Sequence, residues 1–419
     1  MGVPLTLTLD PSGEVLAGDH IDIRVSGAAP GSEVMVIGIR RFWDDKKQLR
    51  AEAVFRADAD GCVDLSRDAP LSGSYAGVHP AGIFWSMTAA GAIDAETPQM
   101  GTVRIEAVAG VARAQADVKL LWERADLLRQ EAPFPGAFLS TLPGAMRRPT
   151  IIGLGGSEGG DGAAGWYASK IGSRGYAVLG FPYYSPPSLQ TQIPGLPTAF
   201  QEIPVDRLQA AYEWLCERPE VDPDRIGIWG GSKGAEFALI AATKFPWIKC
   251  VIASAPTDVV WEGWDEGAAV HVEKSSFSWQ GTPLPYTPRA DPSHLSDFNA
   301  SVFYSHTRGR ELHPQEAEIA RIPIERYRHP LMLVAGGDDR LILALDMARN
   351  IARRRAEAGL PTETLIYPEA GHQLGDDGYS SAEWSCKTGG TLQAQGVARR
   401  DAFVQALRFL EATLGARTR

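Results

Sequence analysis

The chain has 419 residues, a length that exceeds one ordinary domain and suits two, a smaller and a larger. Its formal net charge of −10 argues against a nucleic-acid partner, because there is no basic excess to neutralise phosphates. The four cysteines have no metal-binding spacing, and no apolar stretch is long enough to span a membrane. The first residues lack a basic segment followed by an apolar run, so no signal peptide is expected. We therefore expect a soluble, cytoplasmic protein without a metal.

Residues 1–118 are predicted to form an all-β domain. Apolar and polar residues alternate there with a period of two, in short runs separated by Gly, Pro, Asp and Ser: 5–13, 20–27, 32–43, 49–58 and 103–110. Several short strands at this spacing are typical of an immunoglobulin-like sandwich, although the cysteines do not supply the disulfide of that fold. The prediction therefore concerns the architecture only.

Residues 119–419 have a different pattern, in which short apolar runs alternate with amphipathic segments. The runs resemble strands buried on both faces: 149–154, 176–181, 225–230, 250–255, 331–336 and 363–368. This alternation predicts an α/β domain with a parallel sheet and helices on both faces. The interval 256–325 lacks the rhythm and is rich in Trp, Pro, Gly and Ser, so we expect it to form a lid or a pocket wall.

A nucleophile motif, G-x-S-x-G, occupies residues 230–234 and places Ser232 between an apolar strand and a helical segment. Such a strand-to-helix turn is strained, and glycines on both sides allow the close approach that it needs. The start of the following helix favours an oxyanion. We predict an α/β-hydrolase with Ser232 as its nucleophile.

A second match to the motif occupies residues 155–159, but a flexible, glycine-rich stretch follows it instead of a helix. Its position upstream of Ser232 is where this fold places the loop that contributes to the oxyanion hole. We therefore expect Ser157 to donate a backbone N–H, together with the N–H of Lys233 that follows the nucleophile. The side chains of Lys233 and Glu236 are expected to form a structural salt bridge.

The catalytic base is predicted to be His372, which follows the last apolar run in the loop that contains residues 368–374. In this fold the acid and then the histidine follow the serine along the chain, and functional groups gather at the carboxyl ends of the strands. The other histidines after the nucleophile helix are expected at lid or surface positions: His271, His294, His306, His313 and His329.

The acid of the triad should follow the strand at 331–336, where both Asp338 and Asp339 qualify. The spacing from Gly336 favours Asp339, and Asp338 remains the alternative. The acid would hold the imidazole tautomer and stabilise the imidazolium without being protonated itself.

With these residues in place, the chain resembles the family of acyl-CoA thioesterases and bile acid-CoA:amino acid N-acyltransferases. The resemblance lies in residues 57–87 of the first domain and, in the second, in GLGGSEGG, GYAVLGFPYY, GGSKGAEFAL, LMLVAGGDDR and YPEAGH. It implies cleavage of an acyl thioester, acyl-CoA or carrier-bound, through a covalent intermediate on Ser232, with Asp339 and His372 completing the triad.

The resemblance also bears on the fate of the acyl group. The transferases of the family use cysteine as nucleophile, so the serine here favours transfer to water. Transfer to an amine or alcohol acceptor, or hydrolysis of an ester or amide, remains the alternative. No bound cofactor is expected, since coenzyme A would be part of the substrate. Trp261 and Trp279, in the irregular interval, could line an acyl pocket or simply pack in a lid.

Overall fold

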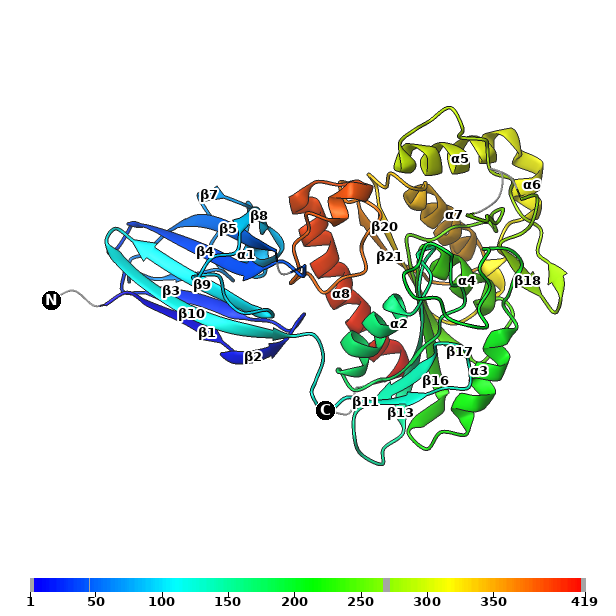
Figure 1. Ribbon diagram of the computed structural model, residues 1–419, viewed down its shortest axis with the longest axis horizontal. Helices are drawn as coiled ribbons and strands as arrows, with labels where there is room; N and C mark the ends of the chain where they lie inside the picture. Colours follow the sequence, from blue (N-terminus) through cyan, green and yellow to red (C-terminus); the bar gives the residue numbers. More distant parts are fainter. Residues whose placement is uncertain (1–3, 45, 267–271, 416–419) are drawn as a thin grey trace. The chain divides into compact units, whose positions relative to one another are not determined.

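The computed structural model describes residues 4–44, 46–266 and 272–415 (Figure 1). The chain divides into two compact units, of which the first comprises Met1–Arg124 and Asp376–Val404 and the second Ala125–Gly375 and Gln405–Arg419. The predicted boundary at residues 118 and 119 falls inside strand β10 (Ala112–Leu121), which pairs with β2 as far as Leu121. Backbone pairing therefore carries the first unit beyond the predicted boundary.

The first unit contains two sheets. The smaller has the strand order β1 (Thr6–Asp10), β3 (Asp22–Ser26) and β6 (Val63–Asp64). The larger has the order β2 (Gly13–Leu16), β10, β9 (Thr102–Ala109), β4 (Glu33–Arg41), β5 (Lys47–Arg56) and β7 (Ser72–Gly73), with β8 (Thr88–Ala92) also on β5. Alternate residues of both sheets enter one shared core, for example Leu9 and Ile23 with Val36 and Ile105. The predicted all-β architecture is confirmed, while the immunoglobulin-like label stays a prediction.

Residues 376–404 return to the first unit, although the sequence pattern does not indicate this. They include a short 3₁₀-helix (Ser385–Thr388) and the first part of α8 (Leu392–Leu414). The Ser381 hydroxyl donates to the Met87 carbonyl over 2.6 Å, and the Ala382 amide donates to the carbonyl of Trp85, at the end of α1 (Gly82–Trp85). Gly396 lies so close to the Trp85 ring that a Cβ atom there would be 2.3 Å from it.

The second unit is built on one large sheet with the strand order β11 (Leu128–Glu131), β12 (Phe138–Thr141), β14 (Ala177–Gly180), β13 (Arg148–Leu154), β16 (Val221–Gly231), β17 (Ile248–Ser254), β20 (Leu331–Gly336) and β21 (Glu363–Tyr367). From β14 to β21 all neighbours are parallel, whereas β11 and β12 form an antiparallel edge. The prediction of an α/β-hydrolase domain is confirmed. The antiparallel edge was not predicted.

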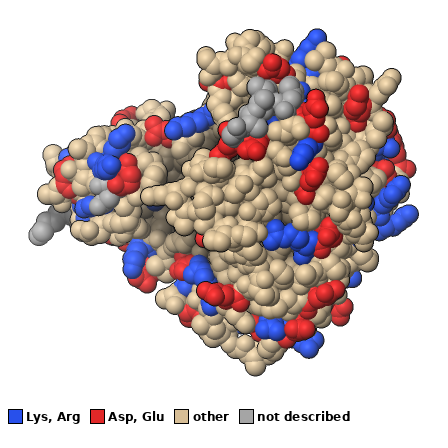
Figure 2. All heavy atoms as spheres, turned by 45° about the vertical axis from the view of Figure 1, so that its right-hand side comes forward, with Lys and Arg blue, Asp and Glu red and all other residues tan. Residues whose placement is uncertain are grey.

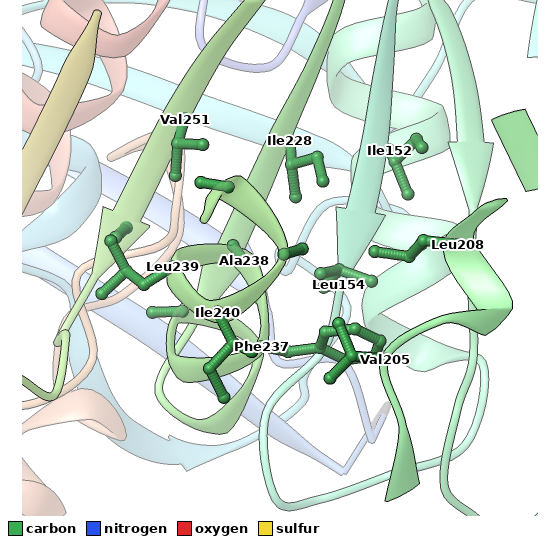
Figure 3. Packing of buried hydrophobic residues seen from close by; sticks show 14 of the residues in the cluster. Ile152, Leu154, Val205, Leu208, Ile228, Phe237, Ala238, Leu239, Ile240 and Val251 are labelled. Carbon is green, nitrogen blue, oxygen red and sulfur yellow. The ribbon is translucent and has the colours of Figure 1, made fainter. Parts of the chain in front are cut away.

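Helices pack on this sheet, and one of them contacts the central strands β13, β16 and β17. They are α2 (Gly162–Tyr167), which continues as a π-helical turn (Ala168–Gly172), α3 (Arg207–Cys216), α4 (Lys233–Ala242), α7 (Ala344–Glu357) and the end of α8. Figure 3 shows the side chains of α4 packed against those of β13, β16 and β17. Every residue of α4 is buried, so this helix has little freedom to move relative to the strands.

The interval 256–325 is more regular than its sequence indicates. It contains β18 (Phe277–Trp279) and β19 (Thr282–Pro283), which form a small sheet with β15 (Ile203–Pro204), followed by α5 (Phe298–Leu312) and α6 (Pro314–Ile319). A 3₁₀ turn (Ile324–Arg326) leads to β20. Helix α5 was missed because only Ser305 and Gly309 are fully buried in it, so its sequence has no apolar stripe.

Within the described ranges, no helix is both long and apolar enough to cross a lipid bilayer. On the face that Figure 2 shows, acidic and basic side chains are interspersed rather than gathered by sign. Any recognition of an anionic substrate on this face would therefore depend on individual side chains rather than on a broad positive field.

Candidate active site

Ser232 lies at the sharp turn between β16 and α4. Its backbone has φ 53° and ψ −117°, a strained conformation for a residue with a side chain. The Ser232 amide donates to the Ser254 carbonyl over 2.8 Å, and its own carbonyl accepts from the Glu236 amide in the first turn of α4. The strand, the neighbouring β17 and the helix together hold the serine in place.

Two glycines of the motif allow this turn to pack. A Cβ atom on Gly230 would lie 2.1 Å from the Gly234 carbonyl oxygen, and one on Gly234 would lie 2.4 Å from the carbonyl oxygens of Leu154 and Gly155. Any larger residue at position 234 would separate α4 from the end of β13. The glycines are thus required by close packing, as the motif predicts.

Asp339 and His372 form the central hydrogen bond of the site. The Asp339 Oδ2 atom lies 2.7 Å from His372 Nδ1, and the two residues are 6% and 7% exposed. The other oxygen, Oδ1, accepts from the amides of Leu341 and Ile342. Asp338, by contrast, is half-exposed and pairs with Arg340. The structure therefore brings Asp339 rather than Asp338 to the histidine.

The carboxylate determines the state of the imidazole. An ionised carboxylate only accepts hydrogen bonds, so Nδ1 of His372 carries the proton and Nε2 is left as the acceptor. Burial by itself lowers the pKa of His372, but the charge and hydrogen bond of Asp339, together with the charge of Glu158, outweigh it and raise the pKa above its usual value.

A cavity of about 150 Å³ opens beside His372. Its lining includes Gly156 and Glu158 of the second glycine-rich motif, Gly231 of the nucleophile motif, and Ser254. Three aromatic residues also line it, and their rings pack edge to face or at a tilt: Trp166, Tyr167 and Trp229. Sequence reasoning did not single out these rings, because they lie on a predicted helix and a predicted strand where an aromatic residue usually belongs to the core.

The second glycine-rich motif lies beside Ser232. A Cβ atom on Gly156 would be 3.4 Å from the Cβ of Ser232, and Ser157 is exposed at the tip of the loop. The Gly156 amide donates to the Glu158 Oε1 atom over 2.8 Å, so one N–H of the loop is engaged by a carboxylate. The sequence analysis did not predict a role for Glu158. Its position inside the second G-x-S-x-G motif was the feature that could have indicated one.

Lys233 is the first residue of α4, and the amides at a helix start have no partner within the helix. Its side chain is buried, with Nζ donating to Glu236 Oε2 over 2.6 Å and to Ser276 Oγ over 2.9 Å. Three rings surround the ammonium group at 5.1 to 5.7 Å: Phe200, Trp264 and Phe277. The predicted salt bridge is confirmed.

The Lys233–Glu236 pair is more deeply buried than a surface bridge. Burial lowers the pKa of Lys233 to about 8, and burial also raises the pKa of Glu236. Glu236 Oε1 accepts from the backbone amide of Trp261, so the pair joins the helix behind the nucleophile to the interval 256–325.

The two tryptophans predicted to bind substrate occupy different places. Trp261 is 2% exposed, and its ring lies 4.7 Å from that of His306. Trp279 packs on Phe245 and Lys244, just beyond the last residue of α4. Since α4 is about 15 Å long, Trp279 lies at the end of the helix opposite Ser232. The structure does not bring Trp279 to the site.

The other histidines have local roles. His294 packs on Tyr304, His306 contacts Trp261, and His329 packs on Tyr327. His313 lies between α5 and α6, and His271 lies outside the described residues. In the part of the chain that the structure describes, no three His, Cys, Asp or Glu side chains gather as they would around a metal ion.

The family model described as "Acyl-CoA thioester hydrolase/BAAT N-terminal region" matches residues 18–130, and "BAAT / Acyl-CoA thioester hydrolase C terminal" matches residues 203–416. Acyl-coenzyme A thioesterase 1 of Rattus norvegicus is 27% identical, over 88% of this chain and 85% of the relative.

Two further relatives cover almost the whole chain. Mitochondrial acyl-coenzyme A thioesterase 2 of Mus musculus is 27% identical over 99% of this chain and 90% of its own length. Peroxisomal succinyl-coenzyme A thioesterase of Mus musculus is also 27% identical, over 98% of this chain and 97% of its own. The acyl groups and compartments in these names differ, although the degree of similarity is the same.

Proposed function

Because the chain belongs to the acyl-CoA thioester hydrolase/BAAT family, we propose that it is a serine hydrolase that cleaves an acyl thioester, acyl-CoA or carrier-bound, through an acyl-Ser232 intermediate. The observation that carries the proposal is the buried hydrogen bond between Asp339 and His372, at the carboxyl ends of β20 and β21, in a sheet whose strand β16 leads into Ser232.

In the first half of the reaction the Ser232 hydroxyl oxygen attacks the thioester carbonyl carbon while His372 Nε2 takes its proton. Asp339 keeps the proton on Nδ1 and stabilises the imidazolium that forms. The tetrahedral intermediate then collapses with cleavage of the carbon–sulfur bond. The leaving thiolate takes the proton from His372, and the acyl group remains on Ser232 as an ester.

In the second half a water molecule attacks this ester, again with His372 Nε2 as the base. Collapse of the second intermediate returns the proton to the Ser232 oxygen and releases the carboxylic acid. No electron transfer is involved, and the enzyme ends in its starting state.

The oxyanion of both intermediates is assigned to the amides of Lys233 and Ser157. The Lys233 amide is at the start of α4, where the helix dipole favours negative charge. Gly156 is a weaker candidate, because its N–H is already bonded to the Glu158 carboxylate. The assignment of Ser157 is supported by its place in the loop next to Ser232, since a Cβ atom on the neighbouring Gly156 would lie 3.4 Å from the Ser232 Cβ.

A cytoplasmic location is the remaining part of the proposal. One relative is named as mitochondrial and another as peroxisomal, so the cytoplasmic location remains a prediction from the sequence. Fractionation of the source cells, with antibodies against this chain, would test it.

The activity can be tested by a mass-spectrometric product screen. Purified protein and Ser232→Ala would receive a panel of acyl-CoA thioesters, each with and without glycine or taurine. Free acid and free thiol from the wild type alone, unaffected by the amine, are the expected result. An amide product would instead establish acyl transfer. Hydrolysis of aryl esters through Ser232 without any thioester cleavage would contradict the thioesterase proposal and retain the triad.

A further inference from the structure

One charged side chain in the cavity beside His372 takes no part in the reaction steps above. This side chain is Glu158, and the cavity that it lines includes His372 itself, so the carboxylate and the catalytic base share one space. Among the described residues of the lining there is no lysine and no arginine. In its resting state, with a neutral imidazole, the lining therefore has a net negative charge beside the reacting atoms.

The Glu158 carboxylate lies close to the nucleophile. A Cβ atom on Gly156 would be 2.6 Å from Glu158 Oε2 and 3.4 Å from the Ser232 Cβ. The distance between Oε2 and the Ser232 Cβ therefore cannot exceed the sum of these two distances, about 6 Å. The other oxygen, Oε1, accepts from the Gly156 amide over 2.8 Å, so a backbone hydrogen bond positions the carboxylate.

The charge of Glu158 acts on two other residues of the same lining. Burial lowers the pKa of His372, and the charges of Asp339 and Glu158 raise it. Burial raises the pKa of Tyr167, and the charge of Glu158 adds to this rise. Both residues line the cavity, so the carboxylate is within electrostatic range of a group bound there.

Aromatic rings provide the second element that a cation requires. Trp166, Tyr167 and Trp229 line the cavity together with Glu158. Trp166 is half-buried, and the centre of its ring lies 5.1 Å from that of Tyr167 and 6.0 Å from that of Trp229. The face of an aromatic ring attracts a cation, and clusters of rings bind quaternary ammonium groups in this way. A carboxylate among such rings favours an ammonium group over an anion.

The size of the cavity limits the group that it can hold. Its volume is about 150 Å³, and a cavity of that volume holds a molecule the size of benzene. A trimethylammonium group on a short chain fits this space, whereas a long alkyl chain does not. Four bonds from a carbonyl carbon to a nitrogen span about 5 Å, a reach that suits the distance between Ser232 and Glu158.

We propose that the cavity beside His372 selects acyl groups that carry an ammonium group a few bonds from the reacting carbonyl. The Glu158 carboxylate pairs with the cation, and the rings of Trp166, Tyr167 and Trp229 pack around it. Anionic acyl groups are disfavoured by the same carboxylate. The proposal rests on the proposed chemistry at Ser232, and it adds the class of acyl group.

The test compares acyl groups of similar shape and different charge. The 4-nitrophenyl esters of 4-(trimethylammonio)butanoic, 5,5-dimethylhexanoic and 4-sulfobutanoic acid are cationic, neutral and anionic, and their coenzyme A thioesters are measured in parallel. At low salt we expect kcat/KM for the cationic ester to exceed that for the neutral ester at least about 5-fold, and the anionic ester to be the poorest.

Two variants remove the two elements of the site. Glu158→Gln keeps the shape of the side chain and should lower the ratio of cationic to neutral ester about 3- to 5-fold. Trp166→Leu should lower the same ratio about 2- to 5-fold, the effect of one cation–π contact. Because Glu158→Gln also changes the pKa of His372, each ratio is taken within one variant, at a pH above its acid limb.

Matched controls separate the site from general damage to the fold. Glu213 and Trp214 lie on α3, the first exposed and the second partly buried, and neither lines the cavity. Glu213→Gln and Trp214→Leu should keep the wild-type ratio. A wild-type ratio near one would overturn the proposal, as would an unchanged ratio in Glu158→Gln or equal losses in Trp166→Leu and Trp214→Leu.

Binding without turnover provides an independent readout. The amides of the cationic and the neutral acid would be compared for protection of Ser232 against a fluorophosphonate label. Stronger protection by the cationic amide, lost in Glu158→Gln, supports the proposal, and equal protection contradicts it. If the esters show the preference but no thioester is cleaved, the cation selection stands and the thioesterase function fails. Thioester cleavage that ignores the charge of the acyl group has the opposite meaning.

Discussion

The Nδ1 atom of His372 lies 2.7 Å from Oδ2 of Asp339, while the other carboxylate oxygen accepts from two backbone amides. One carboxylate oxygen is thus fixed by hydrogen bonds from the backbone of its own loop, and the other orients the imidazole ring. This arrangement fixes the tautomer in which Nε2 is the free base. It is also the feature that separates Asp339 from its neighbour Asp338.

Replacement of the two aspartates should therefore have different effects. We expect Asp339→Asn to lower kcat by about 10³- to 10⁴-fold, since an amide in that position favours the wrong imidazole tautomer. Asp338→Asn should change kcat by less than about threefold, because that side chain is half-exposed and pairs with Arg340. Steady-state kinetics on an activated aryl ester would measure both. Equal losses in the two variants would contradict the assignment.

The two glycine-rich motifs can be separated in the same way. Ser232→Ala should lower turnover at least about 10⁴-fold, as expected for the loss of a nucleophile from a triad. Ser157→Ala keeps the backbone N–H and should retain activity within about threefold, because only its amide is assigned a role. Labelling with a fluorophosphonate, followed by peptide mass spectrometry, should find the label on Ser232. A label on Ser157 would reverse the two assignments.

The pH dependence of kcat/KM should depend on the negative charge of Glu158, because this charge raises the pKa of His372. The base form of His372 is neutral, and its pKa is raised, so activity should fall as the pH drops through a value above the usual one for histidine. Glu158→Gln removes a charge that raises this pKa, so the acid limb of kcat/KM should move to lower pH. The glutamine oxygen can still accept from the Gly156 amide, so the loop keeps that bond.

The matched control for this experiment is Glu213→Gln. Glu213 lies on the exposed side of α3, where it accepts from Gln209. Its replacement should leave the acid limb where it is. If the acid limb of the kcat/KM profile is also unchanged in Glu158→Gln, or moves to higher pH, the electrostatic effect of Glu158 on the pKa of His372 is excluded.

The buried Lys233–Glu236 pair should dominate the stability of the turn. Glu236→Gln leaves the ammonium group of Lys233 without its partner, and we expect the free energy of unfolding to fall by about 3–5 kcal/mol. The double variant Lys233→Met with Glu236→Leu should recover part of this loss, since it leaves no unpaired charge. Urea unfolding followed by circular dichroism measures each variant.

An exposed pair on another helix provides the comparison. Arg353 and Glu357 form an exposed bridge on α7, and Glu357→Gln should cost less than about 1 kcal/mol. If Glu236→Gln costs no more than Glu357→Gln, the structural importance of the buried pair is refuted.

Much of the second unit was predictable because its signals are local. Short apolar runs mark strands that are buried on both faces, and G-x-S-x-G directly after such a run marks the turn at Ser232. The salt bridge between Lys233 and Glu236 follows from their spacing on a helix. The features that were missed lack such patterns. Helix α5 has no apolar stripe, and the edge strands β11 and β12 are short.

The sequence alone therefore determined the α/β-hydrolase fold and the position of Ser232 at a strand-to-helix turn, since periodicity and a local motif specify them. The order of its proposed partners along the chain was a prediction from the same fold. The sequence left Asp338 and Asp339 open, because adjacent side chains point in different directions and only packing decides which one meets His372. Only the tertiary structure showed that the Glu158 carboxylate accepts a hydrogen bond from the Gly156 amide. It also showed that Trp279 packs far from Ser232 and that the rings of Trp261 and His306 are in contact. Those relations join residues that are distant along the chain or depend on one rotamer, and local sequence patterns encode neither.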